Sequence, residues 1–432
     1  MKKIVLGLLT FLFMDQVNAQ VLTLEACQKM ADTANLTIKN AEIDIQSNKK
    51  LYNQYMAARF PQLSFTGDYR YNVKIQGQVV PGEFFGGAPG TFGTVQFGVP
   101  YVLGNTLQLN QVLFNPQVNY GLNSLKINQN VVELQSELTK QNIHFEVAQT
   151  YYTLQGVLKQ IDFLDSNLLN MDVLIKNLEA YVGQGLMVRT EVDKLKINRL
   201  NILNSKQTLE TAKFQLESYL KILIGKKSDE PILIEQDEIV MQTILVNSEE
   251  KNMIELKLLE AQKSLAKEER NGNYMSYLPS LSFYGVYNYN YNIKTDPNFR
   301  KGIDGAFVGL RLDWVLFDGL EKYNKNKVIK FKQESLNNQY DLASQQLEMN
   351  IANAKNQIEI QVNKLNISKE QLLLAEDVYR QSQAQFKEGT IASNDLIKAE
   401  NDLQQAQTNL IGTYIELRKA ELSYLKSIGQ LN

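Results

Sequence analysis

The sequence is poor in the residues that most enzymes use for catalysis. Its 432 residues include one cysteine, Cys27, and one histidine, His144. A single cysteine excludes an internal disulfide, and we interpret Cys27 as a packing residue and His144 as a packed or solvated helix residue. There is no Gly-x-Ser-x-Gly, no Cys/His pair, no phosphate-binding loop ending in Gly-Lys-Ser/Thr and no EF-hand spacing. We therefore expect no enzymatic activity, no metal site and no cofactor.

Charge of one sign and long apolar runs are also scarce. The 45 basic and 47 acidic residues leave a net charge of −2, and the lack of a basic run argues against nucleic acid as a partner. The N-terminus has Lys2 and Lys3, an apolar stretch Ile4–Met14 and a small-residue site at Ala19, which predicts a cleaved signal peptide over residues 1–19. No later stretch approaches the ~20 apolar residues of a membrane helix. If the chain spans a membrane, it must do so with barrel strands.

What the sequence does contain is an internal duplication with an offset of about 200 residues. Four landmarks recur in the same order: Phe60–Asn72 as Leu278–Asn290, Val112–Pro116 as Val315–Gly319, Gly185–Glu191 as Gly389–Asp395, and Ser218–Lys221 as Ser423–Lys426. We predict a first repeat over residues 20–226, and a linker with a second repeat over 227–432. Each repeat is expected to contain a helix, a β-hairpin, a very long helix, a tight turn and a long helix. The segments from the hairpin onward are predicted at about 62–114, 116–182, 183–189 and 190–224, and again at about 280–317, 318–388, 389–393 and 394–428.

The predicted strands alternate apolar and polar residues with a period of two. The pattern runs from Leu63 to Ile75 and again from Leu281 to Ile293, and return strands follow around Val95–Leu109 and Ala306–Leu316. A soluble antiparallel sheet shows the same alternation. The many tyrosines, and lengths at or above the ~9–11 residues of a tilted membrane strand, favour a membrane barrel. The strands alone leave both interpretations open. The glycine-rich stretch Pro81–Gly98 is predicted to be a mobile extracellular loop.

The predicted helices are much longer than those of ordinary globular proteins. Asn115 and Pro116 form a good helix start, and about 67 residues without an interior proline follow, which gives a rod of roughly 100 Å. One stretch repeats apolar residues in steps of three and four, a heptad seam: Leu154, Val157, Ile161, Leu164, Leu168, Met171, Ile175, Leu178 and Val182. Further apolar residues lie outside this seam, so we infer helices with neighbours on two sides, as in a closed ring. An isolated antiparallel coiled-coil hairpin is the alternative.

The number of strands bears on the oligomeric state. One chain offers four candidate membrane strands, whereas small closed barrels start at about eight, and an open edge is not tolerated in lipid. Two, three or four chains would supply about 8, 12 or 16 strands. Geometry alone does not choose among them.

Over nearly its whole mature length, the chain resembles the TolC family of outer-membrane efflux and secretion channels. The residues that carry the resemblance are Leu22–Ala26, Phe60–Ser64, Leu278–Ser282, Gly185–Val188 and Gly389–Ser393, together with the duplication. The resemblance implies a mainly α-helical, duplicated fold. In it, a long periplasmic α-helical barrel is joined to four β-strands per chain, which form a 12-stranded β-barrel in a homotrimer.

The implied function is a passive exit duct in the outer membrane, gated at its periplasmic end. It would serve a tripartite efflux pump or a type I secretion system. The implied partners are a periplasmic adaptor, an inner-membrane transporter of the RND or ABC type, and outer-membrane lipid. The alternative is a periplasmic adaptor, which should have one coiled-coil hairpin, a split glycine-rich lipoyl-like domain and an N-terminal anchor. For this chain we expect two hairpins, duplicated aromatic strands and no anchor. The sequence does not identify the cargo.

The resemblance also implies two sets of functional residues. The turns are expected to dock the adaptor: Gly185, Leu186, Met187, Val188, Gly389, Thr390, Ile391 and Ala392. The gate is expected to use an acidic ring at Asp395, with Glu191 at the matching position of the first repeat and Phe386 at an aromatic site. A second acidic ring of the family falls on Lys398, which departs from the pattern. The alternative for the turn residues is that they cap neighbouring helices, and the alternative for Asp395 is a first-turn helix acid favoured by the helix dipole.

Overall fold

The computed structural model describes residues 21–236, 253–295 and 298–431 of the chain, so the predicted signal peptide lies outside the described residues. The chain divides into two compact units. The first, here called the helical unit, takes its described residues from Met1–Asp44, Glu133–Leu258 and Asp341–Asn432. The second, the sheet unit, comprises the described residues of Ile45–Val132 and Leu259–Tyr340. Both halves of the sequence contribute to each unit, and the predicted repeat boundary at residue 226 stays a prediction.

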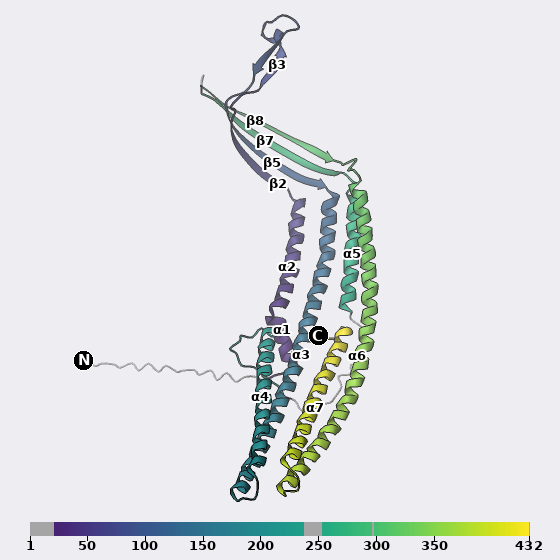
Figure 1. Cartoon of the computed structure of the whole chain (residues 1–432). Helices are drawn as coiled ribbons and strands as arrows, with labels where there is room; N and C mark the ends of the chain where they lie inside the picture. The colour runs from purple at the N-terminus through teal and green to yellow at the C-terminus, as the bar shows by residue number, and fades with distance from the viewer. Residues whose placement is uncertain (1–20, 237–252, 296–297, 432) are drawn as a thin grey trace, which may run out of the picture. The chain divides into compact units, whose positions relative to one another are not determined.

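The sheet unit contains a four-stranded antiparallel sheet in the order β2-β5-β7-β8 (Figure 1). The strands are β2 Gln62–Tyr71, β5 Tyr101–Phe114, β7 Ser280–Lys294 and β8 Phe299–Asp313. Neighbouring strands run in opposite directions, so the two edge strands, β2 and β8, also run in opposite directions.

The strand register places apolar side chains on one face of this sheet. Residues paired across the ladders share a face, and one row contains Phe65, Leu107, Tyr287 and Ala306. The adjacent row of the opposite face contains Thr66, Thr106 and Asn288, and Thr106 Oγ1 lies 2.9 Å from Asn288 Oδ1. The predicted period of two is therefore confirmed. Apolar exceptions on the polar face include Val102, Val286, Ile303 and Phe307, and polar exceptions on the apolar face include Asn105 and Asp304.

Some strand limits differ from the prediction. β2 ends at Tyr71 rather than continuing to Ile75, because the backbone N–H of Asn72 donates to the carbonyl of Pro100 at 2.7 Å and closes the strand pair. The return strand begins at Tyr101 instead of Val95. The glycine-rich segment between them is not a plain loop. It forms a second strand pair, β3 Gly77–Pro81 with β4 Phe92–Gln96, around the short 3₁₀ helix η2 Gly82–Phe85.

The helices are close to their predicted limits. They are α1 Leu24–Ala34, α2 Leu36–Met56, α3 Pro116–Gly183, α4 Arg189–Leu223, α5 Ile254–Met275, α6 Glu321–Lys387 and α7 Ser393–Ser427, with the 3₁₀ turn η1 Ala57–Arg59 after α2. Asn115 caps α3, since its Oδ1 accepts from the N–H of Gln117 at 2.9 Å. α6 begins three residues later than predicted, because Leu320 has a φ of 71° and the Asp318 carboxylate caps the helix, accepting from the N–H of Lys322 at 3.1 Å.

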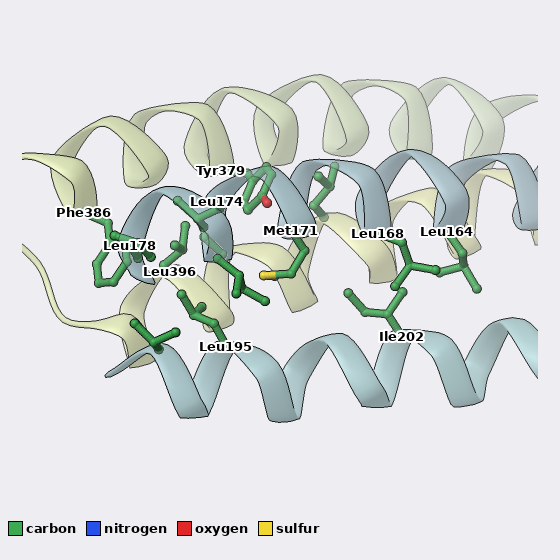
Figure 2. Packing of buried hydrophobic residues seen from close by; sticks show 14 residues of the cluster. Leu164, Leu168, Met171, Leu174, Leu178, Leu195, Ile202, Tyr379, Phe386 and Leu396 are labelled. Atoms are coloured by element: carbon green, nitrogen blue, oxygen red, sulfur yellow. The ribbon is translucent and has the colours of Figure 1, made fainter. Parts of the chain in front are cut away.

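The core of the helical unit lies between two helical hairpins. The first hairpin is α3 with α4, and the second is α6 with α7. Figure 2 shows Met171 and Leu178 of α3, Leu195 of α4, Phe386 of α6 and Leu396 of α7 in one cluster. Eight of the nine predicted seam residues of α3 are buried, and Val182 is partly buried against the cluster. The heptad prediction is thus confirmed.

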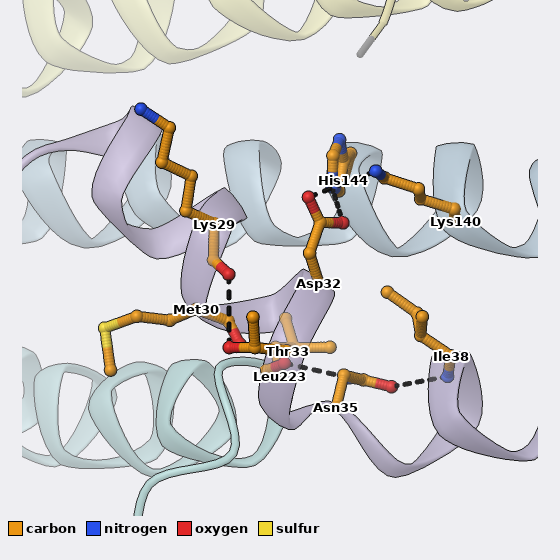
Figure 3. A network of polar contacts seen from close by, with 9 residues as sticks. All are labelled: Lys29, Met30, Asp32, Thr33, Asn35, Ile38, Lys140, His144 and Leu223. Carbon is orange, nitrogen blue, oxygen red and sulfur yellow. Dashed lines mark hydrogen bonds and ion pairs between the residues drawn. The ribbon is translucent and has the colours of Figure 1, made fainter. Parts of the chain in front are cut away.

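A second cluster packs α1 against α3 and the end of α4. Cys27 is fully buried there, and a short parallel pair joins β1 Val21–Leu22 to β6 Leu233–Ile234. Nearby, buried His144 Nε2 lies 2.7 Å from Asp32 Oδ1, and Lys140 Nζ lies 3.1 Å from Asp32 Oδ2 (Figure 3). Both predicted packing residues therefore stabilise helix contacts.

Candidate functional site

The two turns of the helical unit have the same backbone conformation. Gly185 and Gly389 have φ values of 72° and 76°, a left-handed conformation that favours glycine. The N–H of Leu186 donates to the carbonyl of Tyr181 at 2.9 Å, and Thr390 donates to Gln385 at 3.0 Å. Both are the long-range bond of a Schellman helix end, which explains why the glycine follows each long helix.

The residues predicted to dock an adaptor separate into two groups. Leu186 and Val188 are 72% and 67% exposed. Met187 and Ile391 are instead partly buried against the cluster between the hairpins. Of the remaining turn residues, Thr390 and Ala392 are exposed. The turns thus combine two anchoring side chains with exposed apolar ones.

The four residues predicted for the gate lie in three different environments. Asp395 and Lys398 are exposed on α7, and the ion pair that their spacing allows is not formed among the described residues. Phe386 is 2% exposed within the cluster. Glu191 is half-buried and points across to the second hairpin, where its Oε2 accepts from the N–H of Ser393 at 3.0 Å.

Glu191 caps a helix of the other repeat. The N-cap residue of α7 is Ala392, which has no side-chain acceptor, and the Glu191 carboxylate satisfies one of the N–H groups that a helix start leaves free. Lys194 Nζ lies 3.0 Å from Glu191 Oε1. Hydrogen bonds from Ser393 and Lys194 lower the pKa of Glu191 to about 2. This carboxylate is therefore ionised and has a structural contact.

The contact between Glu191 and Ser393 is the first of a series along α7, here called the polar ladder. Its α7 members are buried and spaced by seven residues: Ser393, Glu400, Gln407 and Tyr414. Each is hydrogen-bonded to the first hairpin. The bonds are Ser393 to Glu191, Asn198 Nδ2 to Glu400 at 2.9 Å, Asn167 Nδ2 to Gln407 at 3.0 Å, and Tyr414 Oη to Gln155 at 3.2 Å. Buried polar pairs at a helix seam fix the register of the helices.

Glu400 is the one ladder residue whose charge depends on pH near neutrality. Its side chain is fully buried, and burial raises its pKa to about 7, although hydrogen bonds from Gln404 and Asn198 oppose the shift. Burial raises the pKa of the Tyr379 hydroxyl on α6, and the nearby Glu400 charge adds to this shift. Sequence reasoning missed the whole ladder. The signal was present as polar residues at a seven-residue spacing on α7.

The sheet unit leaves large apolar surfaces open. All ten residues of β2 are exposed, as are most of β8, so described residues of the chain cover neither face of these strands. The backbone edges of β2 and β8 have no described strand beside them. Apolar side chains also stand exposed at the strand ends: Leu113, Phe114, Trp314, Val315, Leu316 and Phe317.

Within residues 21–236, 253–295 and 298–431, no three His, Cys, Asp or Glu side chains are grouped so that they could hold a metal ion. No helix within residues 21–236, 253–295 or 298–431 has both the length and the apolar character needed to cross a bilayer.

Comparison with known proteins adds family information to this geometry. Residues 245–430 match the family model described as outer membrane efflux protein. Among solved structures, CusC has a TM-score of 0.74 with 13% identity, over 94% of this chain and 91% of that chain. The resemblance to the TolC family is confirmed.

Other TolC-type channels give the same result. The outer membrane protein VceC of Vibrio cholerae has a TM-score of 0.69 with 14% identity, over 94% of this chain and 96% of that one. The outer membrane channel MtrE of Neisseria gonorrhoeae, solved in its open state, has a TM-score of 0.69 with 13% identity, over 95% and 89%. No curated protein matches the sequence. The chain has the TolC-like fold, and the family match supports an outer-membrane efflux channel.

Proposed function

We propose that three copies of this chain form an outer-membrane channel that serves as the exit duct of a tripartite efflux pump or a type I secretion system. The observation that carries the proposal is the four-stranded sheet with one apolar face, uncovered strands and two open edges. Because β2 and β8 run in opposite directions, β8 of one copy can pair with β2 of the next as an antiparallel ladder. Repetition of this contact closes a barrel and removes the edges.

The apolar face of the sheet is proposed to contact lipid. The exposed aromatic side chains at the strand ends, including Trp314 and Phe317, suit the interface between lipid and water. A charge on a lipid-facing strand position costs about 2–4 kcal/mol at mid-bilayer, and far less on the lumen side. Thr66 lies on the opposite face of β2 from Tyr69, and its side chain is also exposed.

The test compares these two positions. Tyr69→Arg should reduce the amount of folded, heat-modifiable oligomer in outer-membrane fractions, whereas Thr66→Arg should leave it near the parent level. Equal tolerance of both substitutions would contradict a membrane barrel and favour a sheet in water.

The turns are proposed to dock a periplasmic adaptor that connects the duct to an inner-membrane transporter. Exposed apolar residues at a tip usually mark a partner site, and Leu186 and Val188 provide them. Cysteines at these positions should crosslink to the adaptor in cells. Met187→Cys is the matched control, because its side chain packs against the cluster. A crosslink from Met187 alone would contradict docking through the exposed pair.

Asp395 is proposed to contribute to the gate at this end. It is exposed near the start of α7, and several copies in a narrow mouth would concentrate negative potential and favour cations. Asp395→Ala should weaken cation preference, and block by multivalent cations, in single-channel recordings. Lys398→Ala should strengthen both. Unchanged selectivity in both variants would show that Asp395 is a helix-start acid with no role in the gate.

A further inference from the structure

The internal duplication allows each contact of the polar ladder to be mapped onto the other repeat. The turn glycines Gly185 and Gly389 set an offset of 204 residues. Within one chain, the first hairpin contacts the second through the ladder. In a ring of copies, the second hairpin of one chain must also meet the first hairpin of the next. If the two contacts are related by the duplication, the offset predicts which residues face each other.

The first ladder bond, donated by the backbone N–H of Ser393 to Glu191, maps to two residues whose side chains have opposite charges. Glu191 corresponds to Asp395, and Ser393 corresponds to Arg189. Both Arg189 and Asp395 are exposed. Each lies two positions from a residue of the Glu191–Ser393 bond, which is about 200° around a helix. They are therefore on the far sides of α4 and α7 from the contact within the chain.

The second ladder bond also maps to opposite charges. Asn198 corresponds to Asp402, which is exposed, and Glu400 corresponds to Lys196, which is half-buried. Lys196 Nζ already lies 2.6 Å from Glu179 of α3. Asp402 of another copy would therefore share the Lys196 ammonium with Glu179. At both bonds nearest the turns, the mapping thus predicts a basic residue of α4 opposite an acidic residue of α7.

The bonds farther from the turns do not continue this pattern. The third maps to Leu203 and Gln371, and the fourth maps to Glu210 and Glu359. Glu210 has its own partner, Lys213, at 3.6 Å. Charge complementarity is therefore confined to the end of the helices at the turns.

The same face of α4 also exposes apolar side chains. Leu200, Leu203 and Phe214 are 58%, 44% and 70% exposed. Leu203 and Phe214 correspond to Gln407 and Arg418, both of which are buried in α7. The α4 face is thus the counterpart of a buried face, and it is uncovered in a single chain.

We propose that this face of α4 binds α7 of a second copy, with Arg189 facing Asp395 and Lys196 facing Asp402. The proposal rests on the oligomeric channel proposed above, and it assigns the residues that join its copies at the turn end. The contact joins different surfaces of the two copies, which is the type that generates closed rings. Arg189 of the next copy would then offset part of the negative charge that Asp395 brings to the proposed gate.

Disulfide crosslinking tests the contact directly. The variant with both Arg189→Cys and Asp395→Cys, oxidised in membranes with copper phenanthroline, should give covalent dimers and trimers on denaturing gels. The control pairs Asp395→Cys with Thr190→Cys, which points about 100° away from position 189, and should give mostly monomer. Cys27 does not interfere, because it is fully buried and burial raises its pKa to about 11.

A charge exchange provides the second measurement. Arg189→Asp alone and Asp395→Arg alone should each speed dissociation of the detergent-solubilised oligomer, by about twofold to fivefold, as expected for one exposed ion pair. The double variant should return the rate toward that of the parent. Crosslinking within single chains only, or a double variant no better than the singles, would overturn the proposal.

The outcome also separates this proposal from the proposed function. An oligomer that conducts ions in bilayers but forms no Arg189–Asp395 crosslink would contradict the interface and leave the channel intact. A chain that neither assembles nor conducts would contradict the channel itself.

Discussion

Helices α4 and α7 occupy equivalent places in the two halves of the chain, yet they differ in burial. Both contain 35 residues and follow a turn that ends in the same conformation. α7 buries 16 of its residues, whereas α4 buries six. Since length and position are the same, the difference reflects neighbours: α7 packs against both hairpins, and α4 retains an uncovered face. A duplicated chain thereby shows which surface still needs a partner.

The largest effect that tests this comparison is a cavity in the shared cluster. Leu396→Ala in α7 should lower the free energy of unfolding by about 2–5 kcal/mol, because Leu396 is fully buried between the hairpins. Denaturant unfolding, followed by the loss of the helical circular dichroism signal, measures this change in the free energy of unfolding. Leu200→Ala in α4 is the matched control, and it should matter only when copies are assembled. An equal loss from both in dissociated chains would contradict the difference in burial.

The next effect concerns Glu400, the acid of the polar ladder whose pKa is raised. Burial raises the pKa of Glu400 from 4.5 to about 7, so the packed helices bind a proton that the unfolded chain releases. The free energy of unfolding should therefore fall as pH rises from about 4.5 to about 7, by up to about 3 kcal/mol. Glu400→Gln should remove this slope while keeping the contact with Asn198.

The control for this prediction is Glu376→Gln, which replaces an exposed carboxylate of α6 and should retain the slope. Thermal unfolding followed between pH 4.5 and 8 gives both profiles. A Glu400→Gln variant with the parent profile would show that Glu400 does not carry the proton.

A smaller loss is expected from breaking a neutral bond of the ladder. Asn167→Ala leaves the buried amide of Gln407 without its partner, which should cost about 1–3 kcal/mol. Denaturant unfolding at constant pH measures it. Asn201→Ala, at an exposed position of α4, is the control. If the two variants unfold alike, the ladder bond does not stabilise the packed hairpins.

The smallest effect is expected at the cap of α7. Glu191→Ala removes the acceptor for the N–H of Ser393 and should cost about 1 kcal/mol. The pKa of Glu191 is lowered to about 2, so its stabilisation is present above pH 4.5 and is lost as pH falls toward 2. The variant and the parent should converge in acid. A constant difference at all pH values would argue against the carboxylate as the cap.

The sequence predicts the parts of this structure that depend on periodicity. Apolar steps of three and four identify the seam from Leu154 to Leu178, and glycine after each long helix identifies the turns. Polar residues at seven-residue spacing resemble a solvated face, so the burial of Glu400 and Gln407 depends on a hairpin far away in sequence. The strand limits at Tyr71 and Tyr101 depend on pairing across a long insertion, which local pattern does not reveal.

We infer that further copies of the chain complete the open sheet edges and cover the exposed face of α4. Native mass spectrometry of the full mature protein, released from detergent micelles, measures the number of copies directly. The account predicts three, as a folded complex that retains its helical and strand content. A stable, folded monomer under the same conditions would contradict it.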